Sequence, residues 1–490
     1  MKQHYQLDEA LMAIQQPVDL TDDVRAQMEA SVAFLQRYLS EATAPVYGVN
    51  TGFGSLQNVV ISDSRLGDLQ QNLLITHASG VGELLPRGRV KIMLWLKLLN
   101  MSKGYSAVRP VLFERMAAMF NEGALPLVFE QGSLGASGDL APLSQMVLPL
   151  IGKGLVELPG GPVLSGENWL QSKGWEPLVL GPKEALALIN GTQFMLSHAL
   201  EAYGLISKIQ QLLPWISALS IDAFDCRIEP FYAPIHRVRN QQGQQEVAAE
   251  ILNILEQSPN IKQPKKQVQD QYSFRCIPQV HGASMDALKH CFNIWERELN
   301  AVTDNPNVFE EENMVLSGGN FHGQPLALTL DYAAMALSEI GSISERRTFL
   351  LVSGQRDLPP YLAEDAGIDS GYMIAQYTAA ALASQNKQLC TPASVDSIVS
   401  SNGQEDHVSM GANAAIKLMK VIANVEQILA IEWLCAARAA TCRNLVTAPD
   451  LQAELHSFIE STDLDHTKIP MHALISASHQ WLFRTDDRPE

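Results

Sequence analysis

The sequence lacks the features that mark membrane-spanning, disulfide-linked or zinc-binding proteins. It contains 6 cysteines, which are scattered and form no C-x-x-C pair, so neither a disulfide framework nor a zinc site is predicted. It has no uninterrupted apolar run of about 18 residues, the length that a spanning helix needs. Its first residues lack the apolar core of a signal peptide. These absences predict a reduced, cytoplasmic protein.

Positive charge is scarce as well. The chain has 35 Lys and Arg against 53 Asp and Glu, which gives a net charge of −18. This balance argues against nucleic acid or an anionic membrane as the main partner, because both attract basic surfaces. No pair of histidines shows a metal-ligand spacing such as H-x-x-x-H, so no metal is predicted. A locally positive pocket could still bind a small carboxylate.

Long apolar segments dominate the second half of the 490-residue chain. Their apolar residues recur with helical spacing and cover most of the helix circumference, which is typical of helices buried on several sides. We therefore expect a mainly α fold in which these helices pack against one another and against other subunits. The segments are residues 194–219, 283–303, 324–352, 370–386 and 409–443.

The first half of the sequence predicts shorter helices, small hairpins and a separate domain. Residues 1–195 form the expected N-terminal domain, and residues 196–490 form the long-helix bundle with a short C-terminal tail. Short apolar runs between Gly and Pro predict small hairpins at 153–180 and no other sheet. The lysine cluster at 262–266 is interpreted as a solvated loop. The shorter helices are expected at 8–14, 21–39, 64–79, 87–103, 110–121 and 184–189.

A run of small residues at 132–139 is the most informative stretch. Three Gly, one Ala and two Ser occupy these eight positions, so the backbone can bend tightly. Asp139 is placed to cap a following helix, whose first turn tolerates Pro142. Ala136-Ser137-Gly138 would then lie at a helix N-terminus, where negative charge is stabilised. The plain alternative is a loop before a buried helix, and the order of residues does not match a G-x-S-x-G nucleophile elbow.

Further polar or Gly-rich interruptions separate the predicted helices, and such loops often carry binding groups. A lone histidine such as His77 more often packs than binds a ligand. The loop at Gly52 lacks the third glycine of a dinucleotide-binding motif, because Gln57 occupies that position. The interruptions are residues 47–56, His77, 190–193, 269–276, 304–306, 317–322 and 404–407.

Taken together, these motifs resemble the aromatic amino acid ammonia-lyase family, which includes histidine, phenylalanine and tyrosine ammonia-lyases and related aminomutases. The resemblance runs from about Tyr47 to Leu434. It implies a bundle of the ammonia-lyase/fumarase-like type, a homotetramer whose sites are built from three chains, and no metal or nucleotide cofactor. The motifs are YGVNTGFG at 47–54, GASGDLAPL at 135–143, NGTQ at 190–193 and GGNFH at 318–322.

The resemblance also implies an internal cofactor. In this family an Ala-Ser-Gly tripeptide cyclises and dehydrates to 4-methylideneimidazole-5-one (MIO), and here it would be Ala136-Ser137-Gly138. Ring closure requires the nitrogen of Gly138 to reach the carbonyl of Ala136, and a side chain on Gly138 would crowd that approach. Such an electrophile is needed because ordinary side chains supply bases but no strong electron sink. A non-catalytic helical scaffold, the alternative, would keep the three residues unmodified.

Other roles are implied residue by residue. Tyr47 resembles the general base, which requires a positive field to lower its pKa. Arg275 resembles the clamp for the substrate carboxylate, because a guanidinium matches that group. The turn at 304–306 is expected to shape the chain, not to react. Contacts with the cofactor, the substrate or its ring are implied for Asn190, Gln269, Tyr272, Phe321, Met373 and Glu405.

The pair Thr76-His77 corresponds to the position at which the family distinguishes its substrates. His77 and Glu405 together could bind both nitrogens of an imidazole, whereas a hydrocarbon ring would leave them unpaired at a cost in free energy. We therefore expect elimination of ammonia from L-histidine to give trans-urocanate. His77 could equally bind a phenol, so a tyrosine or phenylalanine ammonia-lyase stays open, as does an aminomutase.

Overall fold

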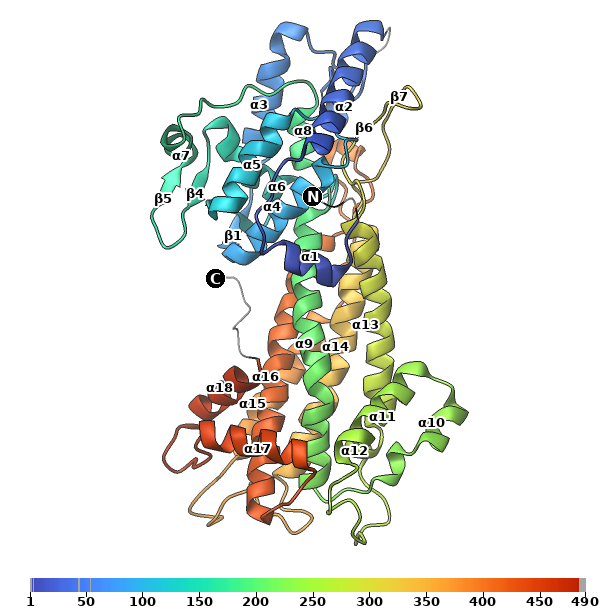
Figure 1. The fold of residues 1–490 in the computed structure, drawn as a ribbon, viewed down its shortest axis with the longest axis vertical. Helices are drawn as coiled ribbons and strands as arrows, with labels where there is room; N and C mark the ends of the chain where they lie inside the picture. The colour runs from blue at the N-terminus through green and yellow to red at the C-terminus, as the bar shows by residue number, and fades with distance from the viewer. Residues whose placement is uncertain (1, 3, 43–44, 53, 484–490) are drawn as a thin grey trace.

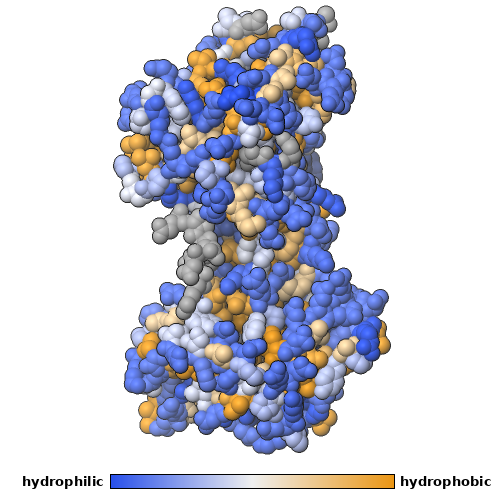
Figure 2. All heavy atoms as spheres, viewed as in Figure 1, coloured by the Kyte–Doolittle hydropathy of each residue, from blue (hydrophilic) through white to orange (hydrophobic). Residues whose placement is uncertain are grey.

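The computed structural model describes residues 2, 4–42, 45–52 and 54–483; Phe53 of the 47–54 motif and residues 484–490 of the tail lie outside this part. The molecule is elongated, with short helices and small sheets at one end and long helices running to the other (Figure 1). Polar residues cover most of the face in Figure 2, with apolar patches between them. This arrangement confirms the expected mainly α fold with a long-helix bundle.

The bundle consists of the long apolar helices. Helix α14 packs against α13 and α16, and α16 packs against α9 and α15. Their bounds lie within a few residues of the predicted ones, except that α13 begins six residues earlier than expected, at Ile277 rather than 283. These helices are α9 (Gln193–Ala223), α13 (Ile277–Leu299), α14 (Gln324–Leu351), α15 (Met373–Leu389) and α16 (Gly411–Arg443).

The other end holds the shorter helices. Helix α4 lies against α5 and against the first half of α9, so it joins this end to the bundle. The division at residue 195 stays a prediction. The helices are α1 (Leu7–Ala13), α2 (Asp22–Glu41), α3 (Leu66–His77), α4 (Arg87–Met101), α5 (Pro110–Glu122), α6 (Leu140–Val147), α7 (Gly166–Ser172) and α8 (Glu184–Ile189), with short 3-10 turns at Gly54–Leu56, Asp63–Arg65 and Leu148–Ile151.

The sheets differ from the prediction of hairpins at 153–180 alone. Strands β4 and β5 do pair there, but helix α7 follows within the same stretch, and further pairs form elsewhere. Strands this short show no alternation of polar and apolar residues, so the pattern could not reveal them. The antiparallel pairs are β1 (Val81–Leu84) with β3 (Phe129–Gln131), β2 (Leu125–Pro126) with β4 (Leu155–Glu157), β4 with β5 (Val163–Ser165), and β6 (Asn307–Phe309) with β7 (Met314–Leu316).

The interpretation of residues 262–266 as a solvated loop is wrong for Lys265. Its side chain is 4% exposed, and Nζ lies 2.5 Å from a carboxylate oxygen of Asp225. The partner lies 40 positions away in the sequence, so the local pattern could not indicate it. The remaining helices at this end are α10 (Ala233–Arg239), α11 (Gln242–Leu255), α12 (Tyr272–Arg275), α17 (Pro449–Ser461) and α18 (Met471–Leu482), with a 3-10 turn at Glu229–Phe231. A further 3-10 turn, Ser401–Gly403, lies against Gly54–Leu56 at the other end.

One helix, α14, is long and apolar enough to cross a membrane by length and composition. However, 67% of its most apolar 18-residue segment is buried inside the fold, which is typical of a helix at the centre of a bundle. All six cysteines lie in the described part of the chain and are free. The cytoplasmic location stays a prediction.

Candidate active site

The tripeptide Ala136-Ser137-Gly138 forms a tight turn directly before α6, as predicted. Gly138 has a φ of +71°, and a Cβ there would lie 2.1 Å from the carbonyl oxygen of Gly191. The backbone N–H of Asp139 donates to that same carbonyl at 2.8 Å. No other residue fits at position 138, because a side chain would collide with backbone that cannot yield. The turn is thus pressed against the segment that contains Gly191.

Asp139 does not cap α6 with its side chain, contrary to the sequence prediction. Its Oδ2 accepts a hydrogen bond from the backbone of Met195 at 3.0 Å, in the first turn of α9, and Oδ1 accepts from Ser133 at 3.0 Å. Complete burial raises the pKa of Asp139 to about 7. Asp139 therefore joins the N-termini of α6 and α9 beside the turn, and both helix ends carry partial positive charge.

Two side chains hold Ser137. Nδ2 of Asn190 donates to the backbone carbonyl of Ser137 at 2.7 Å, while the Ser137 hydroxyl donates to Oε1 of Glu405 at 3.2 Å. The second oxygen of Glu405 accepts from the hydroxyl of Ser400 at 2.6 Å. Oδ1 of Asn190 is buried without a partner in the described part of the chain, so it remains available to a ligand.

A cavity of about 390 Å³ opens above this turn. It brings together side chains from loops and helix ends that lie far apart in the sequence. Its volume suits a small-molecule ligand such as an amino acid. The predicted site residues that line it are Tyr47, His77, Ser137, Asn190, Phe321 and Glu405.

His77, the last residue of α3, presents one defined nitrogen to the cavity. Its Nδ1 lies 2.8 Å from the backbone carbonyl of Leu73, which can only accept, so Nδ1 carries the proton. Burial lowers the pKa of His77, and the hydrogen bond to Leu73 and the charge of Glu405 oppose that shift. The neutral ring therefore leaves Nε2 as a hydrogen-bond acceptor.

Tyr47 lines the cavity, but the expected lowering of its pKa is not found within one chain. Burial raises the pKa of Tyr47, a hydrogen bond from the backbone of Gly54 lowers it, and the negative charge of Glu405 raises it further. No lysine or arginine side chain lines the cavity among the described residues, so the positive field required for a base is missing.

Four predicted site residues lie at the opposite end of the bundle. Asp139 contacts the first turn of α9, whereas Phe274 stacks on Phe224 just past the last turn of that helix, with ring centroids 4.9 Å apart. Helix α9 has 31 residues and, at about 1.5 Å per residue, spans about 45 Å. Figure 1 shows α12 and the beginning of α15 far from α6. The four residues are Gln269, Tyr272, Arg275 and Met373.

Three of these distant residues lie close together near α12: Gln269, Tyr272 and Arg275. Gln269 and Arg275 line a second cavity of about 330 Å³. The guanidinium of Arg275 lies over the ring of Tyr272, 4.6 Å from its centroid, and the Tyr272 side chain is 70% exposed. Nε of Arg275 is buried and has no hydrogen-bond partner in the described part of the chain. Arg275 and the Ser137 cavity thus belong to different regions of one chain.

Comparison with known proteins identifies the family. The sequence matches the profile of the family described as "Aromatic amino acid lyase" over residues 6–461. The chain belongs to the aromatic amino acid lyase family. Among curated members of this lyase family, the histidine ammonia-lyase of Idiomarina loihiensis is 45% identical over 432 residues, which cover 87% of this chain and 84% of that protein.

Solved structures show the same fold for this lyase. The histidine ammonia-lyase from Trypanosoma cruzi matches with a TM-score of 0.89 and 36% identity, covering 98% of this chain and 92% of that one. The phenylalanine aminomutase of Pantoea agglomerans matches with a TM-score of 0.92 and 29% identity, covering 97% of both chains. The fold is therefore shared by an ammonia-lyase and an aminomutase, and of these two structures the histidine ammonia-lyase has the higher sequence identity to this chain.

The sequence analysis missed several residues of the lyase cavity. Asn305, expected only to shape a turn, lines the cavity, and its amide groups also bind Ser317 and Gly318 at 3.0 and 2.6 Å. Leu186 and Ile189 contribute apolar walls from α8. No local pattern distinguishes these residues from ordinary turn or core positions. Only the fold brings them to Ser137.

Several features of the turn suit a ring made from residues 136–138. Gly138 meets the steric requirement at the closing nitrogen, and the backbone of Ala136 pairs with that of Gly138 across Ser137. Asn190 binds the carbonyl that would become part of the ring. Among the described residues, no group of three His, Cys, Asp or Glu side chains is placed to hold a metal ion.

Proposed function

We propose that this chain is a carbon–nitrogen lyase that eliminates ammonia from L-histidine to give trans-urocanate. The observation that carries the proposal is that His77 and Glu405 share one cavity with Ser137. The 45% identity to a protein named histidine ammonia-lyase supports the same substrate. A phenyl ring in that cavity would leave an imidazole and a carboxylate without partners, which disfavours it.

The substrate side chain would bind through its two ring nitrogens. Nε2 of His77 accepts a hydrogen bond from one N–H of the substrate imidazole, because Nδ1 is already engaged by Leu73. Glu405, held by Ser400, accepts a hydrogen bond from the other nitrogen when the substrate ring is bound as an imidazolium, whose two nitrogens both donate. The amino group and the β-carbon of the substrate then lie near Ser137 and Tyr47.

The tripeptide at 136–138 would form the MIO group, which supplies the electrophilic carbon that ordinary side chains lack. The N-termini of α6 and α9 stabilise negative charge that develops beside it. Asn190 orients the carbonyl of Ser137 through its 2.7 Å hydrogen bond. Tyr47 takes the β-proton of the substrate, provided that a cation lowers the pKa of its hydroxyl.

We further propose that this cation comes from another subunit of a homotetramer. Arg275 of the partner subunit would bind the substrate carboxylate and face Tyr47, with Gln269, Tyr272 and Met373 beside it. The separation of Arg275 from the Ser137 cavity by the length of α9 supports this assembly. Exposed apolar side chains along the bundle provide a surface for it: Leu328, Tyr332, Met335, Ile374 and Tyr377.

A direct assay tests the substrate. We expect the purified protein to produce the absorbance of a conjugated acid from L-histidine much faster than from L-tyrosine or L-phenylalanine. A matched reaction without protein gives the background rate. Faster turnover of L-tyrosine or L-phenylalanine would overturn the assignment of histidine while retaining the reaction.

The aminomutase alternative is favoured by one observation, the TM-score of 0.92 to the Pantoea agglomerans enzyme. That reaction would return ammonia to the β-carbon. Chromatography of the products therefore separates the two activities, because an aminomutase yields a β-amino acid without net release of ammonia. The scaffold alternative predicts an intact mass with no loss of two waters and a Ser137→Ala variant indistinguishable from the wild type.

A further inference from the structure

Lys97 is a buried charged residue to which the proposed reaction assigns no role. It lies in α4 within the apolar run from Ile92 to Leu99, and its side chain is 0% exposed. Nζ donates a hydrogen bond to the carbonyl of Asn190 at 2.8 Å and another to the carbonyl of Ala187 at 3.2 Å. A lysine is rarely buried unless its ammonium group is satisfied, and here two backbone carbonyls satisfy it.

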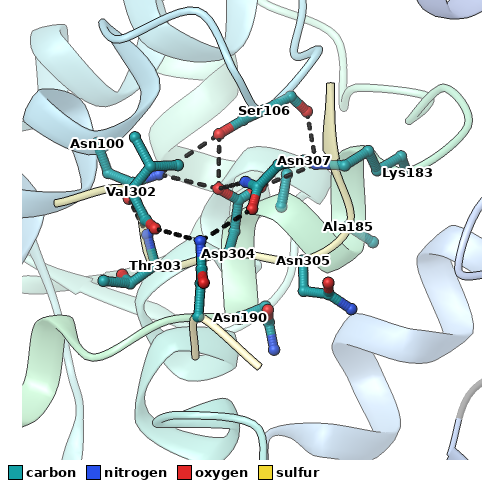
Figure 3. A network of polar contacts seen from close by, with 12 residues as sticks. Asn100, Ser106, Lys183, Ala185, Asn190, Val302, Thr303, Asp304, Asn305 and Asn307 are labelled. Carbon is teal, nitrogen blue, oxygen red and sulfur yellow. Dashed lines mark hydrogen bonds and ion pairs between the residues drawn. The ribbon is translucent and has the colours of Figure 1, made fainter. Parts of the chain in front are cut away.

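Both carbonyls belong to the C-terminal end of α8, a helix of only six residues. Its other end is fixed by a second buried lysine, Lys183, whose Nζ lies 2.8 Å from Oδ2 of Asp304 and 2.7 Å from the carbonyl of Ser106. Figure 3 shows this network, with Asn190 below it on the continuation of the same segment. Such a short helix has little stability of its own, so its position depends on these two anchors.

Helix α4 supplies contacts to both anchors. Asn100 lies one turn after Lys97, accepts a hydrogen bond from the backbone of Thr303 at 3.0 Å and donates to Asp304 at 3.4 Å. One face of α4 therefore holds both the C-terminal end of α8 and the turn at Asp304. The face is rigid because α4 is buried along most of its length.

The segment that Lys97 holds is the one against which the turn at 136–138 lies. Asn190 donates to the carbonyl of Ser137, and Gly191 accepts from the backbone of Asp139. Lys97 thus fixes the Asn190–Gly191 peptide from one side while the turn contacts it from the other. A substitution of Lys97 would therefore shift the Asn190–Gly191 peptide, which contacts the turn, without changing any residue of the turn.

We propose that Lys97 is a positioning residue for formation of the ring from Ala136-Ser137-Gly138, acting through Asn190. The inference depends on the proposed function, because only that function requires the ring. Lys97 takes no part in the chemistry. Its side chain holds the Asn190–Gly191 peptide in place, and the tripeptide packs against this peptide while the ring closes.

Ring formation needs such support because the reacting atoms must be held in contact. The nitrogen of Gly138 bonds to the carbonyl carbon of Ala136, and the carbonyl oxygen leaves as water with the amide protons of Ser137 and Gly138. Ser137 then loses its hydroxyl and its α-proton as a second water. A misplacement of about 1 Å can slow such a reaction about 10²-fold.

The hydrogen bonds of Lys97 do not depend on its charge. Burial lowers the pKa of Lys97 to about 7, and the charge of Asp304 opposes this shift. A neutral amine still carries two N–H groups, enough for both carbonyls. The positioning is therefore expected to persist on either side of neutral pH.

The test compares Lys97→Met with the wild type in the full chain. Methionine has a similar length but no donor, and the apolar surroundings accept it. Cells are sampled at intervals after induction, and the intact mass gives the fraction of chains that have lost two waters. We expect the wild type to lose both waters throughout, whereas a large fraction of Lys97→Met chains keeps the unmodified mass at early times. Lys97→Gln, which has a donor but is too short for both carbonyls, is expected to lie between them.

Leu98→Ala is the matched control. It alters a neighbouring, fully buried residue of α4 and lowers the melting temperature through a cavity, but it leaves the link to Asn190 intact. We expect complete loss of two waters in this control. If both Lys97 variants mature as fast as the wild type, or if Leu98→Ala retains as many unmodified chains, the inference is wrong. Unmodified mass in the wild type itself would instead refute the proposed function.

Discussion

Three polar residues of the cavity, His77, Asn190 and Glu405, are each held by a hydrogen bond to a second residue. Leu73 fixes the proton of His77, Ser400 holds Glu405, and Lys97 holds the peptide of Asn190. Such partners decide which atom is a donor and which an acceptor, and therefore which substrate is bound. Predictions at this scale concern single side chains.

Replacement of His77 tests the choice of substrate. In His77→Leu, we expect kcat/KM for L-histidine to fall by about 10²-fold or more, because a site that hydrogen-bonds its substrate loses that partner. The relative activity on L-phenylalanine should rise. Thr76→Ser, which keeps the adjacent hydroxyl, is the control, and steady-state kinetics with both amino acids is the measurement. An unchanged kcat/KM for L-histidine would contradict the assigned role.

The buried amine of Lys97 predicts a pH dependence of stability. Because burial lowers the pKa of Lys97 to about 7, the native chain releases this proton well below the usual lysine range, while the unfolded chain retains it. The unfolded state binds more protons in that interval, so the free energy of unfolding rises with pH from about 7 to about 10, by a few kcal/mol. The contribution is lost as the pH falls from about 10 to about 7, and below 7 both states hold the proton, so the free energy of unfolding no longer changes with pH through Lys97.

Chemical denaturation of the wild type and Lys97→Met at several pH values measures the contribution of Lys97 to the free energy of unfolding. The difference between the two proteins should be flat below pH 7 and should grow in favour of the wild type above it. Asp139 titrates in the same region and is present in both proteins, so it largely cancels. A difference that is independent of pH would show that Lys97 titrates normally.

At the scale of elements, one buried ion pair connects three long helices. Arg347 of α14 binds Glu432 of α16 through two hydrogen bonds of 2.5 and 2.8 Å, and Ser220 of α9 donates to the same carboxylate at 2.7 Å. Neither charged side chain is exposed. These bonds satisfy both charges inside the buried interior of the bundle.

Breaking this pair should be costly. We expect Glu432→Gln to lower the free energy of unfolding by about 3–5 kcal/mol, because it leaves the Arg347 charge buried and uncompensated. The control is Glu364→Gln, whose carboxylate is 84% exposed and pairs with Arg438; there we expect a loss below about 1 kcal/mol. Thermal or denaturant unfolding of both variants measures the difference. Equal losses would mean that burial does not decide the strength of these pairs.

The sequence predicted the long elements well because each carries many apolar residues at helical spacing. It could not predict strands of two to four residues, nor that Asp139 caps α9 across 56 positions in the chain. Such contacts depend on the fold, not on neighbours in the sequence. Lys97 did leave a signal, since it is the one charge in a long apolar run, and that signal was overlooked.

At the scale of the whole molecule, the predicted site residues divide into two groups. The small-residue motifs and His77 converge on one cavity, whereas Gln269, Tyr272, Arg275 and Met373 lie at the other end of α9. The resemblance implied one site for all of these residues, but sequence motifs cannot say which of them the fold brings together within one chain. The proposed homotetramer would bring the two groups together by pairing one end of one chain with the other end of a second chain.

Complementation between two inactive variants tests that assembly. Ser137→Ala removes the hydroxyl whose loss would give the methylidene carbon, and Arg275→Ala removes the proposed carboxylate clamp, so each alone should lose about 10³-fold or more in kcat. When both are expressed in one cell, mixed oligomers contain some sites with an intact Ser137 from one chain and an intact Arg275 from another. If the chains mix at random, about a quarter of the sites should regain both groups.

Mixing the separately purified variants without subunit exchange is the control and should stay inactive. Ser137→Ala with Asn190→Ala should not complement, because these two residues touch within one chain and an intact pair never meets in a mixed oligomer. Absence of activity in the Ser137/Arg275 mixture, with mixed oligomers shown by mass, would place the whole site within a single subunit and would contradict the proposed assembly.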